Sequence, residues 1–172
     1  MNREPNVREE TRERVEAAAE ALDYRPNLSA RGLAGGRSFL IALLFDNPNL
    51  AYVRDAQLGA VQRCRQSGRH LVIEPVDAAD PELGRLVRQM AAVLRLDGAI
   101  LTPPICDDPV VLDALDRAGI PYVRLSPQRD LDRGARVAMD DVEAASEMTR
   151  HLLALGHTDI AFVQGDPAHG AT

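Results

Sequence analysis

Residues 39–48 read FLIALLFDNP, seven consecutive apolar residues and then a polar turn. An apolar run of this length that ends in turn-forming residues is typical of a β-strand buried on both of its faces. Strands of this kind occur in parallel sheets that helices cover on both sides. The stretch therefore predicts a parallel sheet at the centre of an α/β domain.

Helix and strand patterns alternate from this strand to the end of the chain. Helical stripes are expected at 53–67, 81–94, 112–118 and 142–155, and apolar strands at 70–76, 99–102, 121–125, 137–139 and 160–163. Three of the helices end at a residue type that favours the left-handed end of a helix, namely Gly68, Gly119 and Gly156. This alternation predicts a doubly wound parallel sheet, and ligands bind such sheets beyond the carboxyl ends of the strands.

The pattern upstream of residue 39 is different. Apolar residues recur every three or four positions over 7–24 and predict a helix, which Pro26 ends. Two turns of helix capped by Asn27 fit residues 27–34, but Gly32 and the glycine pair at 35–36 weaken them. The segment is therefore either a hinge that orders conditionally or a plain linker.

Charge and composition restrict the class of protein. The net charge is −6, yet residues 1–37 hold seven arginines and seven acids, so the excess of acid lies beyond residue 37. The front segment suits contact with nucleic acid, but charge alone favours a solvated charged helix. Cys64 and Cys106 are far apart, as in reduced cytosolic proteins, and no apolar run approaches the roughly 18 residues of a membrane span. Without a signal peptide, the expected location is the cytoplasm, with no membrane partner.

No catalytic or cofactor-binding pattern stands out in the sequence. The glycines at 32, 35 and 36 do not match a nucleotide-binding loop, the four histidines lack metal-ligand spacing, and the GxSxG elbow is absent. The pairs at 107–108 and 140–141 are interpreted as polar ligand contacts or turn residues rather than an acid–base pair. We therefore expect a protein that is not an enzyme and that has no cofactor or metal.

Several short motifs together resemble LacI-family transcription regulators. PNVREETRERV at 5–15, LDYRPN at 22–27, ARGL at 30–33 and GRS at 36–38 resemble the third headpiece helix and hinge of the family. VAMDD at 137–141 and HLLALGHTDIAF at 151–162 resemble the end of its first sensor subdomain and the crossover to the second. The motifs keep the order and spacing of the family along nearly the whole chain, and the sequence is identified as a member on their combination.

The resemblance implies a division of the chain. Residues 1–24 correspond to the last helix of a helix-turn-helix headpiece, 25–38 to the hinge, and 39–157 to the first subdomain of an effector-binding domain with a fold like that of periplasmic binding proteins. Residues 158–172 correspond to the start of the second subdomain. The chain is therefore expected to be truncated at both ends, because in the family the helix-turn-helix precedes this segment and most of the second subdomain comes after it.

The resemblance also implies which hinge residues contact DNA. Leu33 corresponds to the apolar wedge that enters the minor groove at the operator centre, with Ala30 as its neighbour. Arg31 corresponds to a phosphate contact, and Tyr24 and Asn27 set the entry into the hinge and contact the DNA backbone. For Leu33, a linker residue packed on its own subdomain remains the alternative.

The candidate effector contacts are chosen by the rule that ligands bind at strand ends. They are Asp46, Tyr52, Arg124 and Asp140. In the family, two sensor subdomains close on a small molecule, such as a sugar or a related metabolite, and shift the protein between DNA-competent and incompetent states. The expected function is thus a dimeric, ligand-responsive regulator, a repressor of sugar or other small-metabolite genes, whose partners are operator DNA, an effector and a second copy. The alternative is a small-molecule binding protein of the periplasmic type with no DNA role.

Overall fold

A computed structural model gives the fold and describes residues 8–22 and 37–165. The contacts within the chain divide it into two units, Met1–Ser38 and Phe39–Thr172. In the first unit, helix α1 spans Glu9–Ala21, inside the helix expected over 7–24. The five candidate DNA contacts lie outside the described residues: Tyr24, Asn27, Ala30, Arg31 and Leu33.

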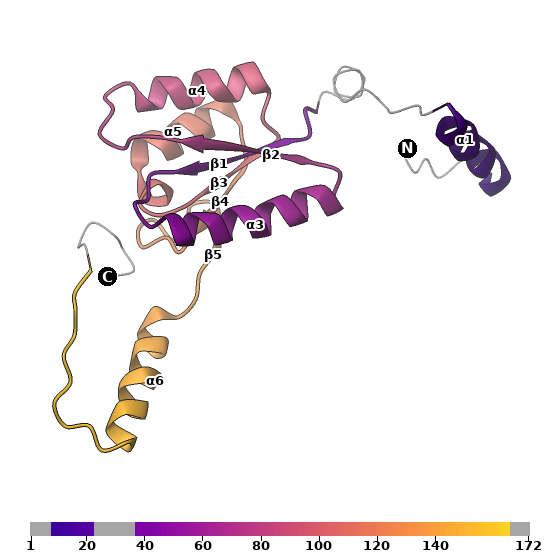
Figure 1. Cartoon of the computed structure of the whole chain (residues 1–172). Helices are drawn as coiled ribbons and strands as arrows, with labels where there is room; N and C mark the ends of the chain where they lie inside the picture. The colour runs from indigo at the N-terminus through magenta and orange to yellow at the C-terminus, as the bar shows by residue number, and fades with distance from the viewer. Residues whose placement is uncertain (1–7, 23–36, 166–172) are drawn as a thin grey trace. The chain divides into compact units, whose positions relative to one another are not determined.

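The second unit is built on a five-stranded parallel sheet in the order β2-β1-β3-β4-β5 (Figure 1). Its strands are β1 (Leu40–Phe45), β2 (His70–Pro75), β3 (Gly98–Leu101), β4 (Tyr122–Leu125) and β5 (Ala135–Val137). The apolar run at 39–45 supplies β1, which pairs with β2 on one side and β3 on the other. The α/β fold with a parallel sheet is therefore confirmed.

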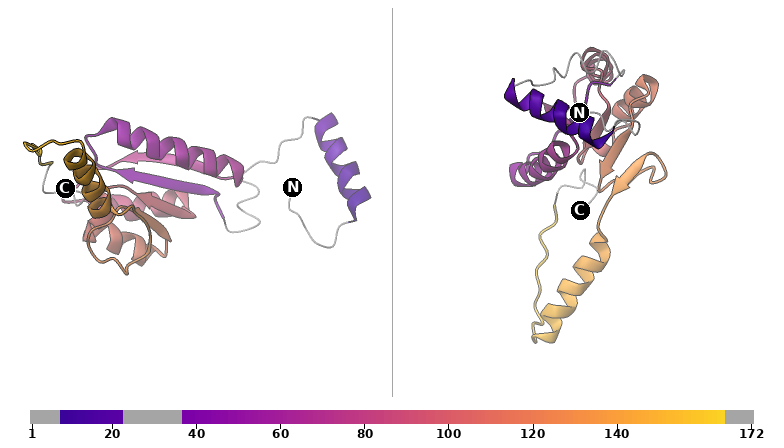
Figure 2. Two further views of the ribbon diagram at one scale, coloured as in Figure 1. Left: turned by 90° about the horizontal axis from the view of Figure 1, so that it is seen from below. Right: turned by 90° about the vertical axis from the view of Figure 1, so that its right-hand side faces the viewer.

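Helices cover both faces of this sheet (Figures 1 and 2). Helix α3 (Leu50–Gln66) lies on one face, and α4 (Leu83–Leu94) and α5 (Pro109–Ala118) lie on the other. A short 3-10 helix, η1 (Ile105–Asp107), precedes α5, and α6 (Asp141–Ala154) comes after β5. Asp108 caps the amino end of α5, because its carboxylate accepts hydrogen bonds from the backbone N–H groups of Val110 and Val111 at 2.8 and 3.1 Å. Gly119 ends it in the left-handed conformation.

The main core lies between the sheet and the helices α4 and α5. The buried stripe of α4, at Leu83, Val87 and Ala91, packs with residues of α5 and with Leu44 and Leu101 of the sheet. On the α3 face, Leu43, Val53 and Cys64 are buried. The central strands are thus covered on both faces, which is the burial that a continuous apolar run requires.

Two expected strands differ from those observed. The strand expected at 137–139 lies two residues earlier, because β5 pairs with β4 at Ala135, Arg136 and Val137. The strand expected at 160–163 is wrong, since residues 157–165 form no regular secondary structure. A strand is held by hydrogen bonds to a neighbour, and no strand among the described residues pairs with this segment.

Gly134, in the turn before β5, is expected to be the most sensitive glycine of the sheet. Its φ is +73°, and a Cβ atom there would lie 2.6 Å from Cε2 of the buried Tyr122 ring. Gly134→Ala should therefore lower the free energy of unfolding by about 2 kcal/mol or more, combining left-handed strain with a clash. Gly68→Ala is the matched control, because φ is +65° but the space is open, and about 1 kcal/mol is expected. Equal losses in urea unfolding would contradict the packing of Gly134 against Tyr122.

Candidate functional site

The loops that come after β1, β2 and β3 are joined at the carboxyl edge of the sheet. Asp46, directly after β1, accepts a hydrogen bond through Oδ2 from the backbone N–H of Ala78, in the loop after β2, at 2.9 Å. Asn47 donates from Nδ2 to the carbonyl oxygen of Pro103, after β3, also at 2.9 Å. Its own Oδ1 accepts from the backbone N–H of Asn49. The edge that the strand-end rule nominated is therefore already organised by its own side chains.

Arg124, in β4, anchors the next group of loops. Its side chain is fully buried, with 0% exposed. All five of its N–H groups donate hydrogen bonds, to the carboxylate of Asp107 and to the carbonyl oxygens of Cys106, Arg129, Asp130 and Arg133. A guanidinium group has five donors, so none is left for a ligand. The structure therefore corrects the expectation that Arg124 contacts the effector and makes it a positioning residue.

Asp107 completes this anchor. Besides Arg124, its carboxylate accepts hydrogen bonds from the backbone N–H groups of Gln128 at 2.9 Å and Arg129 at 3.3 Å. The 3-10 helix η1 is thereby fixed to the loop 126–133, and the exposed Gln128 is held at the carboxyl edge. Asp108, its neighbour, has the different role of capping α5. The pair at 107–108 is thus an anchor and a helix cap, in agreement with the turn-residue interpretation.

Tyr52 and Cys106 lie close together near the same edge. Burial raises the pKa of the Tyr52 phenol, and the Cys106 side chain adds to the rise. Burial also raises the pKa of the Cys106 thiol to about 12, with Asp107 as the second cause. The thiol is therefore protonated at neutral pH, and a protonated buried thiol is inert as a nucleophile.

Thr102, directly after β3, carries a polar group that the rest of the described chain does not satisfy. Its side chain is fully buried, and its hydroxyl has no hydrogen-bond partner among the described residues. Buried polar groups are nearly always paired, and an unpaired one costs about 1–3 kcal/mol. The hydroxyl of Thr102 is thus an unpaired polar group at the start of the loop after β3, next to the edge where a ligand is expected.

Asp140 lies in a polar hollow formed after β4 and β5. Its carboxylate caps α6 by accepting a hydrogen bond from the backbone N–H of Glu143 at 2.9 Å. The hollow has a volume of about 540 Å³ and is lined by Gln128, Arg136, Ala138, Met139, Asp140, Asp141 and Val142. Asp140 is therefore both a helix cap and an exposed acceptor beside the anchored loop.

Sequence reasoning passed over three residues of this edge: Asn47, Thr102 and Gln128. The first two are polar residues close behind an apolar strand, and that position was the available signal. Gln128 carries no comparable signal, because its place depends on hydrogen bonds to Asp107, 21 residues away.

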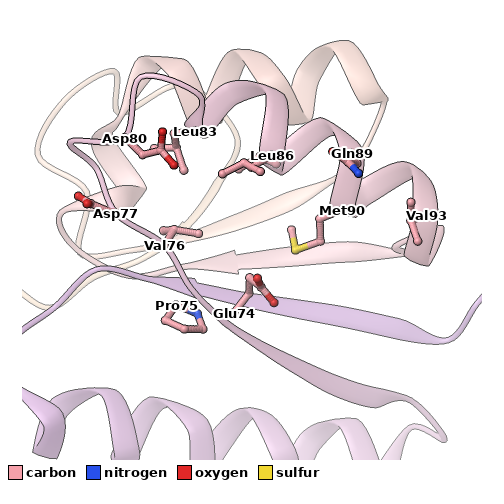
Figure 3. A pocket seen from close by; sticks show the side chains of 11 residues that line it. Glu74, Pro75, Val76, Asp77, Asp80, Leu83, Leu86, Gln89, Met90 and Val93 are labelled. Atoms are coloured by element: carbon pink, nitrogen blue, oxygen red, sulfur yellow. The ribbon is translucent and has the colours of Figure 1, made fainter.

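A second cavity lies between β2 and α4 (Figure 3). Its volume is about 420 Å³, and apolar side chains of α4, including Leu86, Met90 and Val93, line it together with Glu74 and Asp77. Figure 3 shows the Met90 side chain directed toward β2. Because β2 is an end strand of the sheet, this cavity borders a strand that has a neighbour, β1, on one side only.

The doubly wound sheet with an organised carboxyl edge defines a sensor domain of the periplasmic-binding-protein class. The family model "Periplasmic binding proteins and sugar binding domain of LacI family" matches residues 38–172, and "Bacterial regulatory proteins, lacI family" matches residues 1–27. The chain therefore belongs to the LacI family, as its motifs indicate.

Individual relatives are transcription regulators. Catabolite control protein A of Staphylococcus xylosus is 29% identical over 96% of this chain and 50% of its own length. The lactose operon repressor of Escherichia coli is 28% identical over 96% of this chain and 46% of its own. A crystal structure of the lac repressor dimer bound to operator and the anti-inducer ONPF superposes with a TM-score of 0.68 and 27% identity, covering 96% of this chain and 50% of that one. The chain thus spans about half the length of the relatives it matches.

Neither a membrane-spanning helix nor a metal-binding cluster occurs in the part of the chain that the structure describes. No helix in residues 8–22 and 37–165 is long and apolar enough to cross a membrane. The same residues contain no group of three or more His, Cys, Asp or Glu side chains placed to hold a metal ion.

Proposed function

We propose that this chain belongs to a ligand-responsive, DNA-binding transcription regulator, a repressor of genes for a sugar or another small metabolite. The observation that carries the proposal is the direct succession of a DNA-binding family match over residues 1–27 and a sensor domain over 38–172. The first match favours a regulator over a periplasmic-type binding protein without a DNA role. A cytoplasmic location and the absence of enzymatic activity are parts of this proposal.

The effector is proposed to bind at the carboxyl edge of the sheet. Asp46 supports this role because Oδ1 of its carboxylate has no partner in the described part of the chain, while Oδ2 holds the loop after β2. Tyr52 offers an aromatic surface, Asp140 an exposed carboxylate, and Thr102 an unused hydroxyl. Carboxylate and hydroxyl groups that share one edge of a sheet with an aromatic side chain are suited to a polyhydroxylated ligand such as a sugar. Arg124 acts indirectly, by holding Gln128 and its loop in place.

We propose operator contact for the hinge residues that correspond to DNA-contacting residues of the family. Leu33 with Ala30 would enter the minor groove, Arg31 would contact a phosphate, and Tyr24 and Asn27 would contact the DNA backbone. Effector binding would alter the order of this segment, and thereby the affinity for DNA.

The test is DNA binding by the complete gene product that carries these residues. We expect the protein to select a small set of duplexes from fragmented genomic DNA. We also expect their complexes, seen as band shifts, to respond to one class of sugar or related metabolite. Selection of no duplex at physiological salt, together with tight binding of a sugar, would contradict the proposal and favour the periplasmic-type alternative.

Thr102→Val is expected to weaken binding of that effector about three- to tenfold without loss of stability. Valine keeps the shape of threonine but removes the hydroxyl. The free protein thus loses an unsatisfied group, and the complex loses a hydrogen bond worth about 0.5–1.5 kcal/mol. Calorimetric titration and urea unfolding measure the two quantities. Thr149→Val, on the exposed surface of α6, is the control: it removes only an exposed hydrogen bond to the carbonyl of Ala145, so effector affinity should not change and stability should change by less than about 0.5 kcal/mol. A destabilised Thr102→Val protein with unchanged effector affinity would give the hydroxyl a structural role instead.

A homodimer is also part of the proposal, and the face formed by β2 and α4 supports it. On this face Leu86 is half-exposed and Val93 is 72% exposed, and both line the cavity beside the edge strand. Exposed apolar side chains beside an edge strand favour contact with a second chain. Val93→Arg is therefore expected to shift the complete gene product from dimer to monomer in sedimentation velocity. Val110→Arg, on the half-exposed surface of α5, should leave the dimer intact, and an unchanged Val93→Arg dimer would place the interface elsewhere.

A further inference from the structure

The amino edge of the sheet is the edge at which the chain enters the sensor domain. The loops that precede β1, β2 and β3 meet there, because the backbone N–H of His70 donates to the carbonyl of Phe39 at 2.8 Å and that of Asp97 donates to the carbonyl of Leu40 at 2.9 Å. Helices α3 and α4 end at this edge, since each runs back from the carboxyl edge to the start of the next strand. Any surface formed here is therefore connected directly to the amino-terminal unit.

This edge carries a concentration of arginines. Arg63 and Arg65 lie in the last turn of α3, Arg69 in the turn after it, and Arg95 directly after α4. Asp97 is the single acidic residue in the sequence of these two helix ends and the turns after them, and its carboxylate accepts a hydrogen bond from the backbone N–H of Phe39. A basic edge is unexpected on a chain whose net charge is −6.

These arginines differ from most others of the sensor domain in being unpaired. Within residues 37–165, ion pairs occupy Arg54, Arg85, Arg117, Arg124, Arg133 and Arg150. Arg63, Arg65, Arg69 and Arg95 form no ion pair with any residue that the structure describes. Helix dipoles favour a cation at the C-terminal end of each of these helices. They do not explain why cations from two helices and a turn lie at one edge without acidic partners. Because these cations lack acidic partners among the described residues, their charge is available to an external anion.

We propose that this edge, defined by Arg63, Arg65, Arg69 and Arg95, is a second DNA-contacting surface, which binds the phosphate backbone of the duplex held by the amino-terminal unit. The inference rests on the proposed DNA-binding function. Residues 28–38 connect the segment that matches the DNA-binding family model, residues 1–27, to Phe39 at the start of the sensor domain. This connection can span at most about 40 Å when fully extended. A duplex bound by the first unit is thereby kept close to the edge, and duplex DNA presents about one phosphate charge per 1.7 Å. Guanidinium groups bind phosphate with two parallel hydrogen bonds, and all 20 basic residues of the chain are arginines.

Phosphate contacts add affinity without sequence preference, and they make binding depend on salt. The variant Arg63→Gln/Arg65→Gln/Arg95→Gln removes three exposed charges of the edge. Arg54→Gln/Arg85→Gln/Arg88→Gln is the matched control, because it removes three exposed charges from the first halves of the same two helices. Both variants of the complete gene product carry the same net charge. Circular dichroism and thermal unfolding check that both remain folded.

The measurement is fluorescence anisotropy with a mixed-sequence duplex of about 30 base pairs, titrated between about 50 and 200 mM salt. Each phosphate contact contributes about 0.9 to the slope of log affinity against log salt. Loss of three contacts should therefore flatten the slope by about 2.7, so that the deficit of the edge variant relative to the wild type is about 40-fold larger at about 50 mM than at about 200 mM salt, while the control variant matches the wild type. An edge variant with the slope and affinity of the control would overturn this inference and leave the proposed function standing. A wild type that binds no DNA at any salt would overturn the proposed function itself. In a competition experiment, poly-glutamate and unlabelled duplex are compared at equal concentrations of negative charge. If poly-glutamate displaces the labelled duplex more effectively, the edge would be assigned to an acidic protein instead.

Discussion

Arg124→Met is expected to lower the free energy of unfolding by about 3–5 kcal/mol, more than the other substitutions considered in the sensor domain. Methionine fills much of the space but offers no hydrogen-bond donor. The Asp107 carboxylate would lose its cation, and four backbone carbonyl groups, those of Cys106, Arg129, Asp130 and Arg133, would lose a donor inside the protein. Removing one partner of a buried ion pair is strongly destabilising because the other charge remains buried without compensation.

Urea unfolding of the 172-residue chain measures this loss. Arg129→Met is the matched control, since it lies in the same loop with an exposed side chain and contributes only its backbone to the anchor, so a change within about 0.5 kcal/mol is expected. Asp107→Asn should fall between them, at about 1.5–3 kcal/mol, because it removes the charge but keeps one acceptor oxygen. If Arg124→Met lost less than about 1 kcal/mol, the loop 126–133 would not depend on the anchor.

Leu33→Ala is expected to weaken operator binding by the complete gene product roughly 10- to 100-fold. Under the proposed function, this leucine is buried at a base step only in the DNA complex, and loss of most of a buried leucine costs on the order of 2–3 kcal/mol. Effector affinity of the DNA-free protein should hardly change, because residue 33 precedes the first strand of the sensor domain. Titration with the selected operator, and separately with the effector, measures both. Unchanged operator affinity would make residues 27–34 a linker, as the alternative interpretation holds.

Asp140→Ala provides the reciprocal variant. It removes an exposed acceptor at the carboxyl edge and the cap of α6, and should weaken the response to effector while sparing operator binding. If hinge and effector site communicate only through the global equilibrium, the effects of Leu33→Ala and Asp140→Ala should add within about 0.5 kcal/mol. A large coupling between them would indicate a direct structural connection.

Local signals in the sequence predicted most of the fold. The apolar run at 39–45 requires burial on both faces, and a parallel sheet between helices is the arrangement that provides it. Gly68, Gly119 and Gly156 adopt the positive φ expected of them near the ends of α3, α5 and α6. These features depend on residues close together in the chain, so periodicity and turn chemistry were sufficient to find them. The position of β5 was missed, because the register of a strand is set by its neighbour β4.

The candidate site, like the fold, was predicted only in part from the sequence. The sequence by itself placed Asp46, Tyr52 and Asp140 at strand ends, because the topology of a doubly wound sheet brings those ends to one edge. It assigned Arg124 to the ligand on the same grounds, although the residue is an internal anchor. The satisfied guanidinium of Arg124 and the unsatisfied hydroxyl of Thr102 were decided only by the tertiary structure. A hydrogen bond depends on which groups packing brings within about 3 Å, and Asp107 and Arg124 are 17 residues apart in the chain.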